Sequence, residues 1–225
     1  MNPPVVVTVA GTDSGGAAGI AADLATFAAL GVHGACVVTA VTAQDTTGVR
    51  AIHPVPLEVV ATQLDAVLED LDPVAVKTGM LASPEVVRLV AERCAGRILV
   101  VDPVLVATSG AVLGGADVVA AYRSWLLPVA TVATPNEEEF AALGRPAGDH
   151  VLVTRGGDIP TTKDHGTGCT HSAALAAHLA LGVPLAVAAA RADAFVARQL
   201  HLSRDWTLGR GRGPVAHIHN PGEIA

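Results

Sequence analysis

Short apolar runs alternate along this chain with longer helical patterns, and this alternation constrains the fold more than any other feature. The runs are continuously apolar, as in strands covered on both faces, and lie at 5–10, 35–41, 74–78, 98–102, 129–134 and 151–154. Helical patterns lie at roughly 17–30, 56–70, 84–95, 115–126, 136–143, 168–181 and 184–203. Ser83 before Pro84 is typical of a helix start. The order predicts a doubly wound, mostly parallel sheet.

The size and charge of the chain narrow its class. A length of 225 residues is enough for one domain or two small ones. We find no internal repeat, low-complexity segment or linker, so we predict a single domain over 1–225. The formal net charge is −7, and no basic stripe is available for phosphate backbones, so we expect no nucleic-acid partner.

Cysteine usage and hydropathy bear on the compartment. Three cysteines without a framework spacing indicate reduced thiols and a cytoplasmic location. Residues 172–190 are nearly all apolar, but His178 and the Gly182–Pro184 break interrupt the run. Alanine also inserts poorly into bilayers. We therefore predict two packed helices rather than a membrane span.

The segments that follow the predicted strands are the expected place for a ligand, because open α/β sheets bind ligands beyond the carboxyl ends of their strands. These segments read "GTDSGGAAG", "TAQDT", "GML", "DPVLVATSG", "TPNEEE" and "TRGG". They are rich in glycine, small polar residues and acids. This composition suits a polar small molecule and phosphates.

The segment "HGTGCT" at the start of a predicted helix is the strongest single motif. Gly166, Thr167 and Gly168 can present consecutive backbone N–H groups at the positive end of a helix, which is an anion site. Cys169 would lie in the first turn, where the same field lowers the pKa of a thiol. The alternative is a close helix-packing contact with an inert cysteine. We favour the functional interpretation.

The glycine-rich loop after the first strand is not a known nucleotide fingerprint. Asp13 stands where a dinucleotide motif needs its second glycine, and no Lys-Ser/Thr pair completes a Walker loop. Asp23 falls at the edge of the apolar stripe formed by Ile20, Leu24 and Phe27. A carboxylate at a core boundary needs a partner. A ligand donor and a capped or salt-bridged carboxylate remain equally good interpretations.

Five other residues follow predicted strands. The Gln44 carboxamide offers a donor and an acceptor to a heterocycle edge, although an exposed loop glutamine is the simpler interpretation. Met80 is typical of a core or of a ring pocket. Asp102 at a strand end can hold Mg²⁺ through water. Asn136 and Glu139 follow the next strand, at a helix start that favours acids in any case.

Six segments together resemble the hydroxymethylpyrimidine and phosphomethylpyrimidine kinases of thiamine biosynthesis, in the ribokinase superfamily. They are "VAGTDSGGAAGIAADLATFAALGVHG", "TAVTAQDTTGV", "VKTGML", "VVDPVLVATSG", "TPNEEEFAALG" and "HGTGCTHSAALAAHLALG", in the expected order over most of the chain. The resemblance implies a ribokinase-like αβα sandwich around a mainly parallel sheet. It also implies a homodimer.

The resemblance further implies ATP-dependent, Mg²⁺-assisted phosphorylation of 4-amino-5-hydroxymethyl-2-methylpyrimidine and then of its monophosphate. By position, it assigns Gly11, Asp23, Gln44 and Met80 to the pyrimidine pocket, Gly166, Thr167 and Gly168 to the anion hole, and Asn136 and Thr154 to the nucleotide side. It assigns Asp102 and Glu139 to the surroundings of Mg²⁺. Cys169 takes the place of the aspartate base of many superfamily members.

The chain also departs from the family pattern. Ser14 to Ala17 replace Pro-Ser-Gly-Gly, Ala21 replaces a glutamine and Thr108 replaces a lysine. The chain is also shortened on the nucleotide side, around 144–165. A pyridoxal kinase-like enzyme, or a pyrimidine-binding module that has lost ATP turnover, is the alternative. A hydride-transfer enzyme fits worst, because its phosphate fingerprint is absent.

Overall fold

The computed structural model describes residues 2–107, 110–154 and 159–217. Thr108, at the departure noted above, lies outside the described residues. The strands form one six-stranded sheet in the order β3-β2-β1-β4-β5-β6. Their bounds are Val5–Gly11 for β1, His33–Asp45 for β2, Gly48–Pro54 for β3, Ala75–Thr78 for β4, Ile98–Val101 for β5 and Val132–Ala133 for β6. The pairings are parallel except that of β2 with β3, which is antiparallel.

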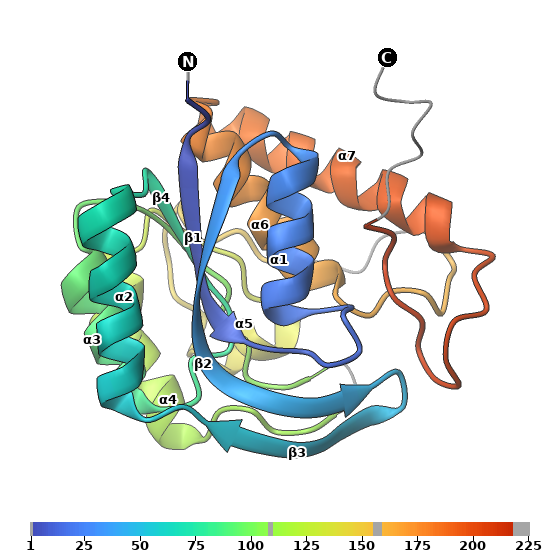
Figure 1. Ribbon diagram of the computed structural model, residues 1–225, viewed down its shortest axis with the longest axis horizontal. Helices are drawn as coiled ribbons and strands as arrows, with labels where there is room; N and C mark the ends of the chain where they lie inside the picture. Colours follow the sequence, from blue (N-terminus) through green and yellow to red (C-terminus); the bar gives the residue numbers. More distant parts are fainter. Residues whose placement is uncertain (1, 108–109, 155–158, 218–225) are drawn as a thin grey trace.

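The helices cover both faces of this sheet (Figure 1). Helices α2 (Leu57–Leu71), α3 (Pro84–Cys94) and α4 (Ala116–Ala121) pack on one face, and α1 (Gly19–Ala29), α6 (Thr167–Ala180) and α7 (Leu185–Ser203) lie on the other. The short α5 (Glu137–Ala142) follows β6. The expected αβα sandwich around a mainly parallel sheet is confirmed.

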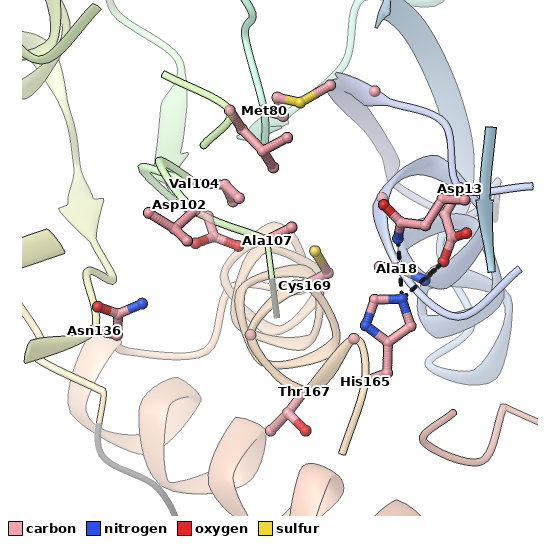
Figure 2. A pocket seen from close by; sticks show the side chains of 18 of the residues that line it. Asp13, Ala18, Met80, Asp102, Val104, Ala107, Asn136, His165, Thr167 and Cys169 are labelled. Carbon is pink, nitrogen blue, oxygen red and sulfur yellow. Dashed lines mark hydrogen bonds and ion pairs between the residues drawn. The ribbon is translucent and has the colours of Figure 1, made fainter. Parts of the chain in front are cut away.

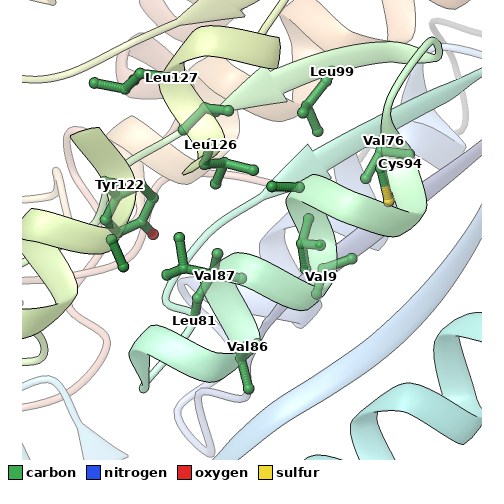
Figure 3. Packing of buried hydrophobic residues seen from close by; sticks show 14 of the residues in the cluster. Val9, Val76, Leu81, Val86, Val87, Cys94, Leu99, Tyr122, Leu126 and Leu127 are labelled. Atoms are coloured by element: carbon green, nitrogen blue, oxygen red, sulfur yellow. The ribbon is translucent and has the colours of Figure 1, made fainter. Parts of the chain in front are cut away.

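Alternate residues of each central strand face opposite layers. Val7 and Val76 belong to the buried cluster under α2 and α3, part of which Figure 3 shows. Val6 and Ala75, one position earlier, belong to the cluster under α1, α6 and α7. Because both faces are buried, most positions carry apolar side chains, and the exceptions such as Thr8 and Lys77 are buried with hydrogen-bond partners. Burial on both faces produces the continuous apolar runs seen in the sequence.

Several local predictions are confirmed. The Ser83 hydroxyl accepts a hydrogen bond from the Val86 N–H at 3.3 Å, and Pro84 opens α3. The apolar stretch over 172–190 is divided between α6 and α7, with the break at Gly182–Pro184. Among the described residues, no helix combines the length and apolarity that a bilayer crossing requires.

Three other predictions about helices and strands were wrong. Residues 151–154 form no strand and contribute only isolated bridges, Ala133 with Val151 and Asn136 with Thr154. The edge strand β3 was not predicted, because its outer positions are exposed and it has no buried apolar run. The helix expected over 115–126 leaves α-geometry after Ala121 and continues as a π-helical turn, Tyr122–Leu126.

Candidate active site

A cavity of about 220 Å³ opens at the carboxyl ends of β1, β2, β4 and β5 (Figure 2). Its wall includes residues from every loop named above as a candidate ligand segment. Of the predicted site residues, all but Asp23 line it: Gly11, Gln44, Met80, Asp102, Asn136, Glu139, Thr154, Gly166, Thr167, Gly168 and Cys169. The fold therefore gathers side chains that are up to 158 positions apart in the chain, from Gly11 to Cys169.

Gly166 forms the turn that begins α6. Its φ is +89°, and an added Cβ would lie 1.8 Å from the Ala17 carbonyl oxygen, so only glycine fits. Thr167 donates its N–H to the Asp164 carbonyl at 3.1 Å and is therefore already paired, contrary to expectation. Within the described residues, the N–H groups of Gly168 and Cys169 have no hydrogen-bond acceptor. These two groups are donors that could bind an anion at the helix start.

The thiol of Cys169 differs electrostatically from the prediction. Burial raises its pKa to about 12, although the Lys77 ammonium acts in the opposite direction. Negative charge on Asp23 and Asp102 adds to the rise. The predicted lowering of this pKa was therefore wrong, because desolvation and two nearby carboxylates outweigh the field of the helix start. The resting residue is a neutral thiol at the cavity wall.

Asp23 does not line the cavity. Its carboxylate is fully buried, accepts a hydrogen bond from the Thr8 hydroxyl at 2.6 Å and pairs with the Lys77 ammonium at 2.9 Å. The assignment of Asp23 to the pyrimidine pocket is corrected accordingly, and the salt-bridged alternative holds. Lys77 itself was not singled out. The sequence feature that could have identified Lys77 was its place in the strand-like run 74–78, where a charge would be buried and would need a partner.

Asp102 follows β5 and lies at the cavity floor. It accepts a hydrogen bond from the Ser172 hydroxyl of α6 at 2.9 Å, and its Oδ2 is 3.9 Å from Lys77 Nζ. Burial raises the pKa of this carboxyl, and Lys77 opposes the rise. Asp102 is thus held from two sides by residues on different layers of the fold.

Glu139 and Asn136 cap the start of α5. Asn136 Oδ1 accepts the Glu139 N–H at 2.9 Å, and Glu139 Oε2 accepts the Asn136 N–H at 2.9 Å, which is a capping box. Burial raises the pKa of Glu139 to about 7, and repulsion by Asp102 adds to the rise. The capping box thus holds at the cavity wall a buried acid whose pKa is raised by a second acid.

Asp102 and Glu139 fit a divalent cation that takes only part of its ligands from the protein. No group of three or more His, Cys, Asp or Glu side chains able to hold a metal is found in the part of the chain that the structure describes. Mg²⁺ commonly takes one or two carboxylates and completes its shell with water and substrate phosphates. The mutual repulsion of Asp102 and Glu139 would be relieved by such an ion.

Two further residues of the cavity wall were not predicted as site residues. The Asp13 carboxylate accepts N–H groups of its own loop, from Gly15 at 2.7 Å, Ala18 at 3.0 Å and Ala17 at 3.1 Å. His165 Nε2 lies 3.2 Å from Asp13 Oδ2 and 3.0 Å from Gln44 Nε2, as Figure 2 shows for the first contact. Both stand inside the two glycine motifs, and their position there was the available signal.

The fold and the cavity define a small-molecule kinase of the ribokinase-like class. The chain belongs to the phosphomethylpyrimidine kinase family, whose model matches residues 13–151 and 145–216. It is 44% identical over 258 aligned positions to the hydroxymethylpyrimidine/phosphomethylpyrimidine kinase of Rhizobium meliloti, covering 96% of this chain and 97% of the relative. The family makes the protein a phosphotransferase.

Two solved structures are also similar. The pyridoxal kinase of Staphylococcus aureus in complex with AMP-PCP has a TM-score of 0.84 at 30% identity, covering 96% of this chain and 94% of that one. The phosphomethylpyrimidine kinase of Clostridium difficile has a TM-score of 0.74 at 32% identity, covering 87% and 98%.

The matches bear on the shortened segments. The alignment with the Rhizobium meliloti kinase runs over 258 positions, more than the 225 residues of this chain, so that relative has residues that this chain lacks. The family model matches in two segments that overlap at 145–151. The junction between the two matched segments falls within the segment around 144–165 where the sequence indicated a shortening.

Proposed function

We propose that this single-domain protein transfers a phosphoryl group from ATP to the hydroxymethyl oxygen of 4-amino-5-hydroxymethyl-2-methylpyrimidine. We further propose that it phosphorylates the resulting monophosphate, as a step of thiamine biosynthesis. One observation carries this proposal: Gln44 and Met80 line the same cavity as the glycine turn that begins α6. A heterocycle-reading amide and an anion site thus lie within reach of one small molecule.

Gly11 and Met80 lie close together at the proposed pyrimidine end of the cavity. An added Cβ on Gly11 would lie 2.5 Å from Met80 Cε, so this glycine lets the thioether approach the backbone of β1. A flat ring suits a slot of this kind, and Gln44 at its wall offers a donor and an acceptor. The pyrimidine is therefore the ring we place here.

The anion end supports the transfer itself. Phosphoryl transfer depends mainly on positioning and on stabilising the charge of the transferred group. The unpaired N–H groups of Gly168 and Cys169 are preorganised donors for that charge. In the first transfer Cys169 lies where a base would take the proton of the substrate hydroxyl, a role that only its thiolate form could perform. The second transfer begins from an anionic phosphate oxygen and has less need of a base.

We place Mg²⁺ at Asp102 and Glu139, with Asn136 and Thr154 on the nucleotide side of the cavity. A bound Mg²⁺ would neutralise charge on the nucleotide phosphates. The protein contributes two buried carboxylates whose oxygens are already oriented by Ser172 and by the α5 cap. Their preset geometry lowers the cost of ordering ligands when the ion binds.

Two further properties belong to this proposal. The three cysteines are all free thiols, which supports a reducing, cytoplasmic compartment. Val41 of β2 is exposed at 51% of its surface, and we propose a homodimer formed through the face of the β2–β3 hairpin that carries it. Sedimentation velocity of the purified protein, compared with a Val41→Lys variant, tests the dimer. A monomeric wild-type protein at micromolar concentration would refute it.

The activity is tested by incubating the protein with the free pyrimidine, ATP and Mg²⁺ and measuring the masses of the products by mass spectrometry. We expect one added phosphate and then two. Pyridoxal in a parallel reaction tests the related substrate. Asp102→Asn is the matched control for the proposed Mg²⁺ ligand, because Asn removes the carboxylate but retains an acceptor for Ser172. Pyrimidine binding without any ATP-dependent product would instead indicate a binding module. Faster turnover of pyridoxal would refute the pyrimidine assignment.

A further inference from the structure

Three side chains form a hydrogen-bonded chain along the pyrimidine end of the cavity. His165 Nε2 lies 3.2 Å from Asp13 Oδ2 (Figure 2). The same nitrogen lies 3.0 Å from Nε2 of the Gln44 amide. The Asp13 and His165 side chains are 2% and 10% exposed. All three residues line the cavity, and Gln44 is the most exposed of them.

The partners of His165 Nε2 determine which way the Gln44 amide is turned. Burial opposes ionisation of Asp13, but hydrogen bonds from His165 and the Gly15 N–H hold its pKa below the ordinary value. An ionised carboxylate only accepts hydrogen bonds, so His165 Nε2 carries a hydrogen that points at Asp13. The Gln44 atom facing the same N–H must then also be an acceptor.

The two ends of a carboxamide have nearly the same shape, and the hydrogen-bond network decides between them. As assigned, Gln44 Nε2 faces His165 Nε2, so that the NH₂ group of Gln44 and the N–H group of His165, both donors, would point at each other. A half-turn of the amide replaces this contact with an acceptor, Oε1. The same half-turn directs the NH₂ group of Gln44 away from His165 and toward the cavity.

The backbone around these residues is fixed, so little other freedom remains. The Ser14 hydroxyl donates to the Gln44 carbonyl at 2.6 Å and accepts the Gln44 N–H at 2.8 Å. His165 is tied through its backbone to Gly213 and Val215, each at 3.1 Å. With both backbones held, the Gln44 amide can still rotate about its last side-chain bond.

We propose that His165, held by Asp13, is a positioning residue that turns the Gln44 NH₂ toward the cavity and so selects heterocycles with a ring-nitrogen acceptor. This inference rests on the proposed function and specifies how its pocket reads the ring. Neither His165 nor Asp13 touches the reacting atoms in this scheme. Their effect therefore falls on ring recognition, and the phosphoryl-transfer end of the cavity stays as it is.

The test measures binding by calorimetry without ATP, for two ligands of the same shape. One is 4-amino-5-hydroxymethyl-2-methylpyrimidine, and the other is 2-amino-4-methylbenzyl alcohol, in which carbon replaces both ring nitrogens. For His165→Phe we expect roughly tenfold weaker binding of the pyrimidine, as for one lost hydrogen bond. Binding of the benzene analogue should change by less than about twofold. His201→Phe, on the exposed surface of α7, is the control.

A second variant keeps the test decisive if His165→Phe does not fold. Gln44→Glu retains an acceptor for His165 but has no NH₂ group, so it should lose the preference for the pyrimidine over the benzene analogue. Equal losses for both ligands, retained preference in Gln44→Glu, or a wild-type protein that binds both ligands equally would each overturn the inference. A wild-type protein that binds neither ligand would instead refute the proposed function.

Discussion

The Lys77 ammonium lies 2.9 Å from Asp23 Oδ1, and neither side chain has any solvent-exposed surface. The same ammonium is 3.9 Å from Asp102 Oδ2 at the cavity floor. Burial favours the neutral amine, but Asp23 raises the pKa of Lys77 above its ordinary value, so the lysine stays charged. One cation therefore compensates two buried carboxylates, one in the helical layer and one in the active site.

Replacing Lys77 by methionine removes this shared cation and leaves two buried carboxylates without their partner. We expect the unfolding free energy to fall by about 3–5 kcal/mol, as for a buried ion pair broken on one side. Urea unfolding at pH 7 measures the change. Arg93→Met is the control, because its ion pair with Asp65 is largely exposed and should matter by about 1 kcal/mol or less. A loss no larger than that of the control would contradict the prediction.

The turn at Gly166 should not accept a side chain. In Gly166→Ala the new methyl group meets the Ala17 carbonyl at 1.8 Å and the residue keeps a left-handed φ. The φ alone costs about 1–2 kcal/mol, and the clash adds to it, so both thermal stability and kinase activity should fall. Gly168→Ala is the matched control, because its Cβ meets nothing within 4 Å. Equal melting temperatures for the two variants would show that the turn relaxes.

Cys169 should be unreactive at neutral pH. A thiol with a pKa near 12 is only about 10⁻⁵ thiolate at pH 7. Alkylation by iodoacetamide, followed by peptide mass mapping, should therefore be slower than for a short cysteine peptide. Its rate should rise about tenfold per pH unit from 7 to 9. Modification at the rate of the free peptide at pH 7 would mean that the helix field prevails after all.

The two phosphoryl transfers should respond differently to loss of this thiol. In Cys169→Ala the first transfer loses the group whose thiolate form would take the proton of the hydroxyl, whereas the second transfer starts from a phosphate anion. We expect the first rate to fall by about 10²-fold or more and the second by much less. Single-turnover assays, started separately from the pyrimidine and from its monophosphate, compare the two. Similar losses in both steps would argue for a structural role of the thiol.

Glu139 should make the protein less stable as the pH rises. In the unfolded chain this carboxyl releases its proton near 4.5, but in the folded protein it keeps the proton to about 7. The folded state therefore binds more protons between these values, and stability is lost as the pH rises through that window. The expected loss is roughly 3 kcal/mol.

Urea unfolding from pH 4.5 to 8, without divalent cations, measures this loss. Glu139→Gln should flatten the profile, because glutamine keeps the capping box but does not titrate. Mg²⁺ should restore stability to the wild-type protein at pH 8 more than to the variant. Parallel profiles for the two proteins would remove Glu139 as the cause.

Much of the fold followed from local pattern. Strands covered on both faces are apolar at most positions, so β1, β2, β4 and β5 could be located from composition alone. The edge strand β3 could not, because its exposed positions have no such constraint and its pairing with β2 depends on a turn. Likewise 151–154 is apolar like a strand, but only Val151 and Thr154 make bridges.

The site divides in the same way. The glycine motifs and the order of the loops indicated which residues would meet, because parallel strands bring their carboxyl ends to one edge. The direction of a single side chain was a different matter. Asp23 was assigned to the ligand, yet its partner is Lys77, 54 positions away. No periodicity within α1 carries information about a lysine on β4.

The sequence by itself determined the layer order, the edge of the sheet where the cavity opens and the family, because these depend on hydrophobic period and on short contiguous motifs. Only the tertiary structure decided the charge state of Cys169, the partner of Asp23 and the chain from Asp13 through His165 to Gln44. Each of these depends on desolvation and on distances between residues far apart in the chain. Such quantities exist only once the layers have packed.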